Sequence, residues 1–328
     1  MTTRISAAAL LGCLCMLMSA LVLADTSRAD FGFEPASVSS RLLDDAGNPI
    51  TQAASHTSQV VSMRFKTRVD SNGFTVPDQT VRDVSVDLPP GLVGDATAVP
   101  ACEPSLFAQA ACPPASQVGM AVIKTQLVPF EPESFTVAPL YLIEPERGQL
   151  ARLGFKEFQN NVSIEVKLRT DGDYGLTASS HDLPSGLLVD GVRLMLWRVP
   201  ADPANDRLRG LHGGATCFGD PDDLATVCSQ VGAGSGVEQR PFMSAPTSCG
   251  APLLTAFATR SWTEPERWVQ EQSSGPVLSG CEQVPFVPSI GVRAESSQPD
   301  TPSGLDLSLA FDQTGTRSPK GLTSSPLK

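Results

Sequence analysis

Positive charge is scarce in this chain. Among its 328 residues, 24 are Lys or Arg and 35 are Asp or Glu, so the formal net charge is −11. Proteins bind the phosphates of nucleic acids mainly through Lys and Arg, and an acidic chain is repelled by those phosphates. Anionic membrane surfaces attract basic segments for the same reason. We therefore expect neither nucleic acid nor a membrane surface to be a partner of the mature protein.

Histidine is also rare, and the three histidines have no evident catalytic partner in the sequence. His56 lies in a polar stretch, His181 precedes an aspartate in a predicted turn, and His212 is followed by two glycines. Segment 234–236 is Gly-Ser-Gly, which lacks the Gly-x-Ser-x-Gly spacing of a nucleophile elbow. A Ser/His hydrolase is therefore disfavoured, and we predict that the protein is not an enzyme.

Acidic residues leave one enzymatic alternative open. Glu131, Glu133, Glu144 and Glu146 flank prolines in two short segments. Glycoside hydrolases use a pair of carboxylates, and the sequence alone does not say whether two of these side chains meet. A glycoside hydrolase-like enzyme is kept as an alternative, although solvated turn residues are the more common role of such charges.

Closely spaced cysteine pairs are missing as well. The chain has eight cysteines but no Cys-x-x-Cys, which disfavours a zinc site. Two cysteines lie in the N-terminal apolar run, and the remaining six are an even number, which predicts disulfides in an exported chain. Their order favours three local pairs over the other pairings that six cysteines allow: Cys102 with Cys112, Cys217 with Cys228, and Cys249 with Cys281.

Only one long apolar run is present, and it lies at the N-terminus. Ile5–Ala24 is uninterrupted by charge, follows Arg4, and leads to small-x-small sequences that end at Ala24 and Ala29. This arrangement predicts a signal peptide over 1–29 and a secreted or cell-envelope protein. An uncleaved membrane anchor is the alternative, because the run is long enough to span a bilayer.

Alternation of apolar and polar residues dominates the rest of the chain. In segment 161–169, Val162, Ile164, Val166 and Leu168 alternate with polar side chains. Such alternation is typical of antiparallel strands with one buried face. We predict an all-β fold, an antiparallel two-sheet sandwich, with strands near 33–42, 58–69, 80–88, 117–128, 138–143, 149–158, 161–170, 174–181 and 187–198.

The character of the sequence changes after Trp197. Residues 201–282 hold four of the six cysteines and few strand patterns, and strand patterns return at 252–260, 288–295 and 304–312. We predict a β-sandwich domain over 30–200, followed over 201–328 by a disulfide-rich loop region with a second, partial β module. Short helical turns are expected at 203–209 and from Thr263, with Glu266 completing a cap, through Val269.

A Pro-x-Gly-Leu sequence occurs four times, ending at Leu92, Leu187, Leu305 and Leu322. Proline sets one backbone dihedral and glycine lets the chain change direction, so each copy predicts a turn that starts a strand. A shared ligand site is the alternative. The spacing between copies is irregular, which excludes a solenoid repeat.

The segment VRDVSVDLPPGLVGDATAVPACEPSLFAQAACPPASQVG, residues 81–119, resembles a module of large exported bacterial proteins, mostly actinobacterial, whose function is unknown. The pattern is Leu-Pro-x-Gly-Leu, a cysteine, and then Cys-Pro-x-x-Ser-x-Val-Gly. LWRVPADPANDRLRG, PTSCGAPL and CEQVPFVPSI are similar to the same family. The resemblance implies a β-rich surface or secreted module, and it implies no catalytic residue.

Two candidate ligand sites remain. Asp171, Asp173 and Asp182 have the spacing of the first, third and twelfth positions of a calcium-binding loop, although Leu176 stands where that loop has glycine. Calcium is the one candidate cofactor; otherwise no cofactor is expected. Trp262 and Trp268 are candidates to flank a carbohydrate, and burial against the loop closed by Cys249 and Cys281 is the alternative.

Together these features favour an exported structural or adhesive cell-surface module without catalytic activity. Its expected partners are cell-envelope polymers or other surface proteins. A carbohydrate-binding exported module is the first alternative, and the glycoside hydrolase-like enzyme is the second.

Overall fold

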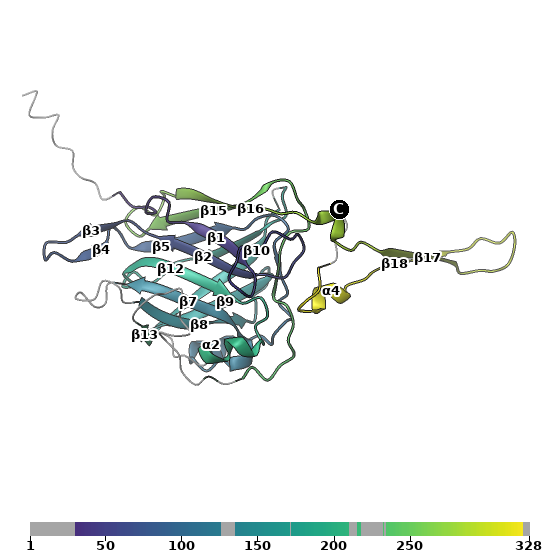
Figure 1. Cartoon of the computed structure of the whole chain (residues 1–328), viewed down its shortest axis with the longest axis horizontal. Coiled ribbons are helices and arrows are strands. Elements are labelled where there is room, and N and C mark those ends of the chain that lie inside the picture. The colour runs from purple at the N-terminus through teal and green to yellow at the C-terminus, as the bar shows by residue number, and fades with distance from the viewer. Residues whose placement is uncertain are drawn as a thin grey trace, which may run out of the picture. The chain divides into compact units, whose positions relative to one another are not determined.

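The computed structural model of the chain describes residues 30–125, 135–170, 172–209, 215–217, 232 and 234–323 (Figure 1), with residues 215–217 described by their backbone. The predicted signal peptide lies outside these residues. Within the described part, no helix has the length and apolar character needed to cross a membrane.

Twelve of the described strands form one antiparallel sheet, which confirms the all-β prediction. Their bounds are β1 (Ser39–Leu43), β2 (Ser58–Arg64), β5 (Val81–Asp87), β7 (Gln117–Thr125), β8 (Phe135–Ile143), β9 (Ala151–Glu157), β10 (Asn160–Leu168), β11 (Leu176–Ser180), β12 (Val189–Leu196), β13 (Ala215–Cys217), β15 (Pro252–Ser261) and β16 (Val269–Val277). Neighbours follow the order β1-β2-β12-β7-β8-β9-β10-β11-β5-β15-β16, and β13 pairs with β8.

The smaller elements lie around this sheet. Three two-stranded sheets pair β3 (Thr67–Val69) with β4 (Thr75–Pro77), β6 (Val93–Gly94) with β14 (Met243–Ser244), and β17 (Pro288–Ala294) with β18 (Leu305–Phe311). The helices are α2 (Pro104–Ala108) and α4 (Thr314–Arg317), and 3-10 turns span Pro114–Ser116, Pro203–Leu208 and Cys281–Gln283. The short helical turn expected at 203–209 is thus confirmed.

Alternating side chains place one face of the sheet on a single large core. In β10, Val162 and Ile164 are buried, while the residues between and after them are partly or fully exposed. β7 differs, because its outer face is buried too: Met120 and Val122 pack with Trp197 and Leu208 from the segment that follows β12. That cover explains why β7 is apolar on both faces.

The sheet curls until its two end strands, β1 and β16, approach each other. Just beyond these strands, Ser279 donates its N–H to the carbonyl of Thr51, and the carbonyl of Ser279 accepts the N–H of Ala53. Both bonds measure 2.8 Å. Apart from β14, whose Met243 is buried in the main core, the long strands around that core belong to this one sheet, so the expected division into a two-sheet sandwich is not confirmed. β15 pairs with β5, and therefore the boundary predicted near residue 200 does not divide the sheet.

Three of the four Pro-x-Gly-Leu sequences lead directly into a strand, as predicted: β6, β12 and β18 begin within two residues of the leucine. In the first two, the leucine N–H bonds back to the first proline carbonyl. In the first, Gly91 has φ +84°, which L side chains rarely adopt. The fourth copy ends at Leu322, which forms an isolated bridge with Ser55. The motif thus forms turns in this fold.

The helix predicted from Thr263 to Val269 is wrong. The structure has a turn there, and β16 begins at Val269. The strand was missed because it is an end strand of the sheet, with the polar sequence Val-Gln-Glu-Gln-Ser-Ser and mostly exposed side chains. End strands of this kind carry little of the alternation that reveals a buried face.

Candidate functional site

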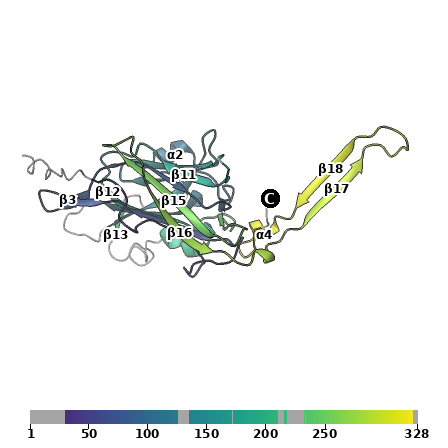
Figure 2. The ribbon, with the colours of Figure 1, turned by 90° about the horizontal axis from the view of Figure 1, so that it is seen from above.

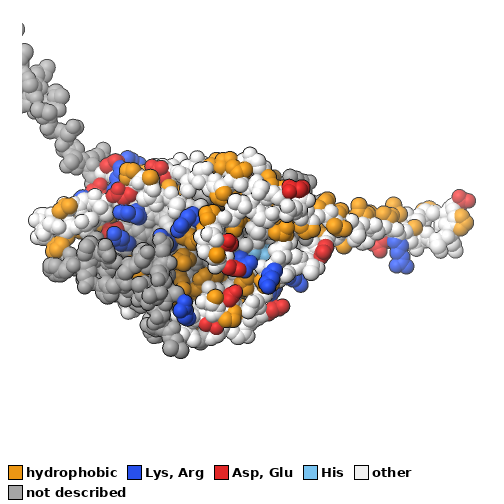
Figure 3. Space-filling view, in the orientation of Figure 1, with side chains coloured by type: hydrophobic (Ala, Val, Ile, Leu, Met, Phe, Trp, Pro, Cys, Tyr) orange, Lys and Arg blue, Asp and Glu red, His pale blue; other side chains and the backbone are white. Residues whose placement is uncertain are grey.

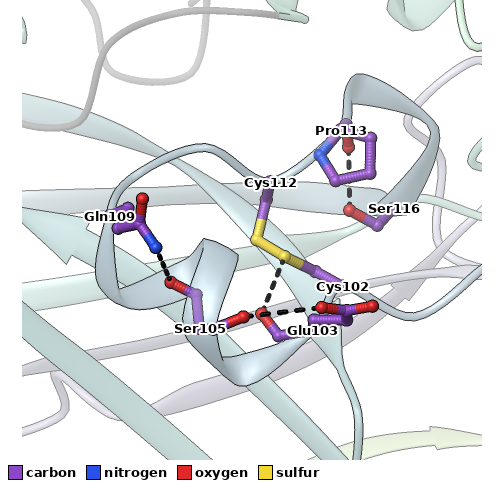
Figure 4. The surroundings of a disulfide bond; sticks show 7 residues. All are labelled: Cys102, Glu103, Ser105, Gln109, Cys112, Pro113 and Ser116. Atoms are coloured by element: carbon purple, nitrogen blue, oxygen red, sulfur yellow. Dashed lines mark hydrogen bonds between the residues drawn. A yellow bond between two sulfur atoms is a disulfide. The ribbon is translucent and has the colours of Figure 1, made fainter.

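Two of the three predicted disulfides are confirmed. Cys102 bonds to Cys112 beside α2 (Figure 4), and Cys249 bonds to Cys281. The third prediction, Cys217 with Cys228, falls outside the described residues, since Cys228 is not described and Cys217 is described by its backbone. Disulfides are typical of an oxidising, extracellular type of environment.

The cysteine motif after α2 positions the start of β7. Ser116 donates its hydroxyl to the carbonyl of Pro113 at 2.8 Å, and Val118 is fully buried. At Gly119, a Cβ atom would lie 1.9 Å from the carbonyl oxygen of Met195 on β12, so only glycine allows the two strands to approach this closely. These residues have a structural explanation and do not by themselves form a ligand site.

The two candidate tryptophans lie in the turn that connects β15 to β16. Trp262 is 40% exposed and Trp268 is 38% exposed, so the alternative of burial against the disulfide loop is not what the structure has. Arg82 lies over the ring of Trp262 at 5.0 Å, and Arg260 lies over the ring of Trp268 at 4.7 Å. Each ring therefore has one face covered by a guanidinium group.

Asp83 connects these two stacked pairs. Its carboxylate is buried on β5 and accepts bonds from the Arg260 side chain and from the N–H of Asp182, with Arg82 at 3.7 Å and His181 at 3.5 Å. Burial alone would raise the pKa of Asp83, but its hydrogen bonds and the Arg260 charge outweigh it, so the pKa lies below the usual 3.8. The cluster therefore favours the ionised form of Asp83, paired with Arg260.

Sequence reasoning missed Asp83, Arg82 and Arg260. Asp83 and Arg260 are 177 residues apart in the chain and meet only because β5 pairs with β15. Alternation on β5 predicts that Asp83 faces away from the core, but it does not reveal which strand lies beside it. The arrangement places two partly exposed aromatic rings next to paired charges.

The calcium prediction is tested only in part, because Asp171 lies outside the described residues. Both oxygens of Asp173 accept bonds from Arg169, at 2.9 and 2.7 Å, and Asp182 accepts a 3.0 Å bond from Arg82. Where the structure is described, no group of three His, Cys, Asp or Glu side chains is placed to hold a metal. Asp173 and Asp182 are therefore explained by arginine partners, and calcium stays a prediction.

Two of the three histidines are described, and each contacts polar groups of neighbouring segments. His56 is buried between Ser244, whose hydroxyl lies 2.9 Å from Nδ1, and the Gly315 carbonyl, which accepts from Nε2 at 3.0 Å. Burial lowers the pKa of His56 below its usual 6.5. His181 faces Asp83, and His212 lies outside the described residues.

One buried carboxylate went unnoticed in the sequence. Glu157, at the end of β9, is fully buried, and Thr136 donates its hydroxyl to one carboxylate oxygen. The other oxygen has no partner among the described residues. Burial raises the pKa of Glu157 to about 7. Of the glutamates considered for glycoside hydrolysis, Glu131 and Glu133 are not described, and Glu146 pairs with Arg152 at 2.9 Å.

A row of exposed apolar side chains lies on the β17–β18 hairpin, whose strands pair with each other and with no other described strand (Figure 2). The register places eight apolar side chains on one face and leaves Ala310 on the other, and hydrophobic side chains run along the hairpin in Figure 3. Five of them are between 46% and 72% exposed. We call this set the apolar hairpin face: Pro288, Ile290, Val292, Ala294, Leu305, Leu307, Leu309 and Phe311.

Both ends of the hairpin are tied to the large sheet. Before β17, Cys281 is bonded to Cys249, three residues ahead of β15. After β18, the carbonyl of Gly315 accepts from His56, and the carbonyl of Pro319 accepts from Arg198 at 2.9 Å. Further hydrogen bonds join the same flanking segments to the rest of the fold, among them the one from the Thr323 N–H to the Ala54 carbonyl at 2.8 Å. The fold thus holds an exposed apolar element in place through a disulfide and several hydrogen bonds.

Comparison of the chain with protein-family models, with curated proteins and with solved structures finds no match. The resemblance carried by residues 81–119 therefore stays a prediction. Function has to be argued from the geometry of the described residues.

Proposed function

We propose that this protein is an exported structural or adhesive module without catalytic activity, which attaches to another surface protein through the apolar hairpin face. The single observation that carries the proposal is that face, a row of exposed aliphatic side chains on a two-stranded ladder. Export is supported by the N-terminal apolar run of the sequence and by the two disulfides.

The physical reason is that the apolar face of a sheet needs a second layer. Two-stranded hairpins are at best marginally stable in water by themselves, and contiguous exposed apolar patches mark interaction sites. The polar face of the hairpin carries Ser289, Arg293, Asp306 and Ser308 and suits contact with water. A partner protein that covers only the apolar face therefore supplies the second layer that the hairpin lacks.

The two tryptophans favour a second candidate, a carbohydrate-binding exported module. Trp262 and Trp268 expose part of their rings beside the charges of Arg82, Asp83 and Arg260. Protein sites for sugars combine an apolar ring surface with polar hydrogen-bonding groups. Because Arg82 and Arg260 each cover one ring face, the two tryptophans leave less aromatic surface for a sugar than the sequence suggested.

A cosedimentation assay with envelopes of the producing cell separates the candidates. Leu307→Asp puts a charge on the apolar hairpin face, and Ser308→Asp puts the same charge on the opposite face as a matched control. We expect Leu307→Asp to weaken binding about tenfold and Ser308→Asp to leave it nearly unchanged, because only the first charge is desolvated by the partner. Protease treatment of the envelopes should abolish binding.

Equal binding by Leu307→Asp and the unchanged protein would refute the hairpin proposal. A third variant, Trp262→Ala with Trp268→Ala, tests the second candidate in the same assay. Loss of binding in that variant, together with binding that survives protease treatment of the envelopes, would replace the adhesive proposal with carbohydrate binding.

A further inference from the structure

The curled sheet encloses a cavity of about 470 Å³. Its wall comes from eight neighbouring strands, β2, β12, β7, β8, β9, β10, β11 and β5, and from the segment around β6 and β14. Sites for small ligands typically measure about 300–1,000 Å³. Antiparallel sheets that close on themselves fill their interior with side chains when they are narrow and hold a ligand when they are wider.

The wall is almost entirely aliphatic. Valine, leucine and isoleucine supply most of it, no described lining residue is charged, and Gln59, Ser180 and Tyr174 are the polar side chains. Water needs two to four polar partners to be held in a cavity, so a site of this kind is poorly suited to ordered water. It is well suited to hydrocarbon.

The hollow is open to solvent. Leu176, Ala178, Val192 and Leu194 point inward from β11 and β12, yet each is only partly buried, as expected where a space is left beside them. Close packing would have buried them fully, as it buries Leu142 on β8, which does not line the cavity.

An apolar mouth lies at the end where β10 finishes and β11 begins. Val93, Leu150, Leu168 and Tyr174 line the cavity and are between 46% and 68% exposed. Arg169 lies beside this opening, where it donates to the backbone carbonyls of Leu88 and Leu176, both lining residues. The mouth itself is thus largely aliphatic, and the Tyr174 hydroxyl and the Arg169 guanidinium are polar groups beside it.

From this distribution we propose that the cavity binds the hydrocarbon chain of a lipid, with the chain inside the curled sheet and the polar end of the lipid at the Val93–Tyr174 mouth. Free fatty acids and phospholipids carry the same chain, and both fit the chemistry of the wall. The site is independent of the hairpin and of the proposed adhesive function.

The test is titration of the full, disulfide-intact chain with cis-parinaric acid, a fatty acid that fluoresces in apolar surroundings. We expect saturable binding of one molecule per chain. Ala178→Phe fills the middle of the cavity from β11 and should weaken binding about tenfold or more, because the ring takes the space of the chain. Ala258→Phe adds the same ring on the outer face of β15, beside Ser85 and Gln270, and should leave affinity nearly unchanged.

Ala151→Phe, on the opposite side of Val166 from Ala178, repeats the test if Ala178→Phe fails to fold. Displacement of the probe by palmitic acid identifies free acid as a ligand, and lipid found by mass spectrometry after incubation with phosphatidylcholine vesicles identifies phospholipid. Absence of saturable probe binding, or equal affinity in the cavity-filling and outer-face variants, would overturn the proposal.

Discussion

Two buried carboxylates show opposite consequences of burial at the scale of the residue. Asp83 is buried, which by itself would raise its pKa, but the backbone N–H of Asp182 and the Arg260 side chain keep that pKa below its usual value. Glu157 has one hydroxyl partner and one oxygen without a partner among the described residues, so burial dominates and its pKa rises to about 7. The difference lies in the neighbours, because both side chains are removed from water.

Glu157 therefore makes stability depend on pH. Its pKa is about 7 in the folded protein and near 4.5 otherwise, so the folded state binds more protons between these values, and stability falls as pH rises through that range. Above it, the ionised carboxylate costs roughly 3 kcal/mol. We predict that Glu157→Gln removes this loss and is more stable than the unchanged protein at alkaline pH.

The measurement is the free energy of unfolding in denaturant over a series of pH values. Glu144→Gln, at an exposed glutamate, is the control and should leave the pH dependence as it is. An identical slope for Glu157→Gln and the unchanged protein would show that this carboxyl does not titrate as described.

At the scale of the element, the hairpin β17–β18 depends on how it is joined to the sheet. Most side chains of the hairpin are exposed, so packing does little to fix its position. The Cys249–Cys281 bond before it, and the contacts of His56 and Arg198 with the segment after it, help to hold it in place. The two strands themselves follow the alternation of apolar and polar residues: Ile290 pairs with Leu309, and Val292 pairs with Leu307.

We predict that Cys249→Ser with Cys281→Ser lowers the free energy of unfolding by about 4 kcal/mol, because the bond closes a loop of 32 residues in the unfolded chain. Cys102→Ser with Cys112→Ser opens a shorter loop, with a separation of 10, and should cost about 3 kcal/mol. Chemical denaturation of both double variants checks the order. A midpoint that neither double variant changes would mean that the bonds add nothing to stability.

At the scale of the whole molecule, closure of the curled sheet depends on the first described residues. Phe33 packs against Phe65 at the end of β2, with ring centroids 5.8 Å apart, and against Phe257 on β15 at 6.4 Å. Phe33 and Phe257 are buried, and β2 and β15 are distant in the order of the sheet. The aromatic cluster therefore joins β2 to β15, two strands that are not paired with each other.

We predict that Phe33→Ala lowers the free energy of unfolding by about 3–5 kcal/mol, the usual cost of truncating a buried phenylalanine. Phe286→Ala, at a half-exposed position beside the hairpin, is the matched control and should cost less than about 1 kcal/mol. Denaturant unfolding of both variants measures the difference. Similar losses at the two positions would show that the Phe33 cluster does not hold the sheet closed.

Local features of the sequence determined most strands of the large sheet, the turns at the Pro-x-Gly-Leu sequences and two of the disulfides, but not the end strand β16. Alternation around Val162 and Ile164 predicted β10 because a strand's two faces differ in solvent contact over a few residues. The bonds at Cys102–Cys112 and Cys249–Cys281 join cysteines that are neighbours in the chain, so their order was sufficient.

Only the tertiary structure decided which strands lie side by side and what they enclose. The pairing of β5 with β15 brings Asp83 to Arg260, and no local pattern specifies a partner 177 residues away. The cavity depends on the curvature of a sheet whose inward side chains look alike in sequence: Leu176 lines the cavity, whereas Leu142 is packed outside it. Curvature and pairing arise from contacts summed over the whole chain, and for that reason one aliphatic residue packs tightly while another lines an open space.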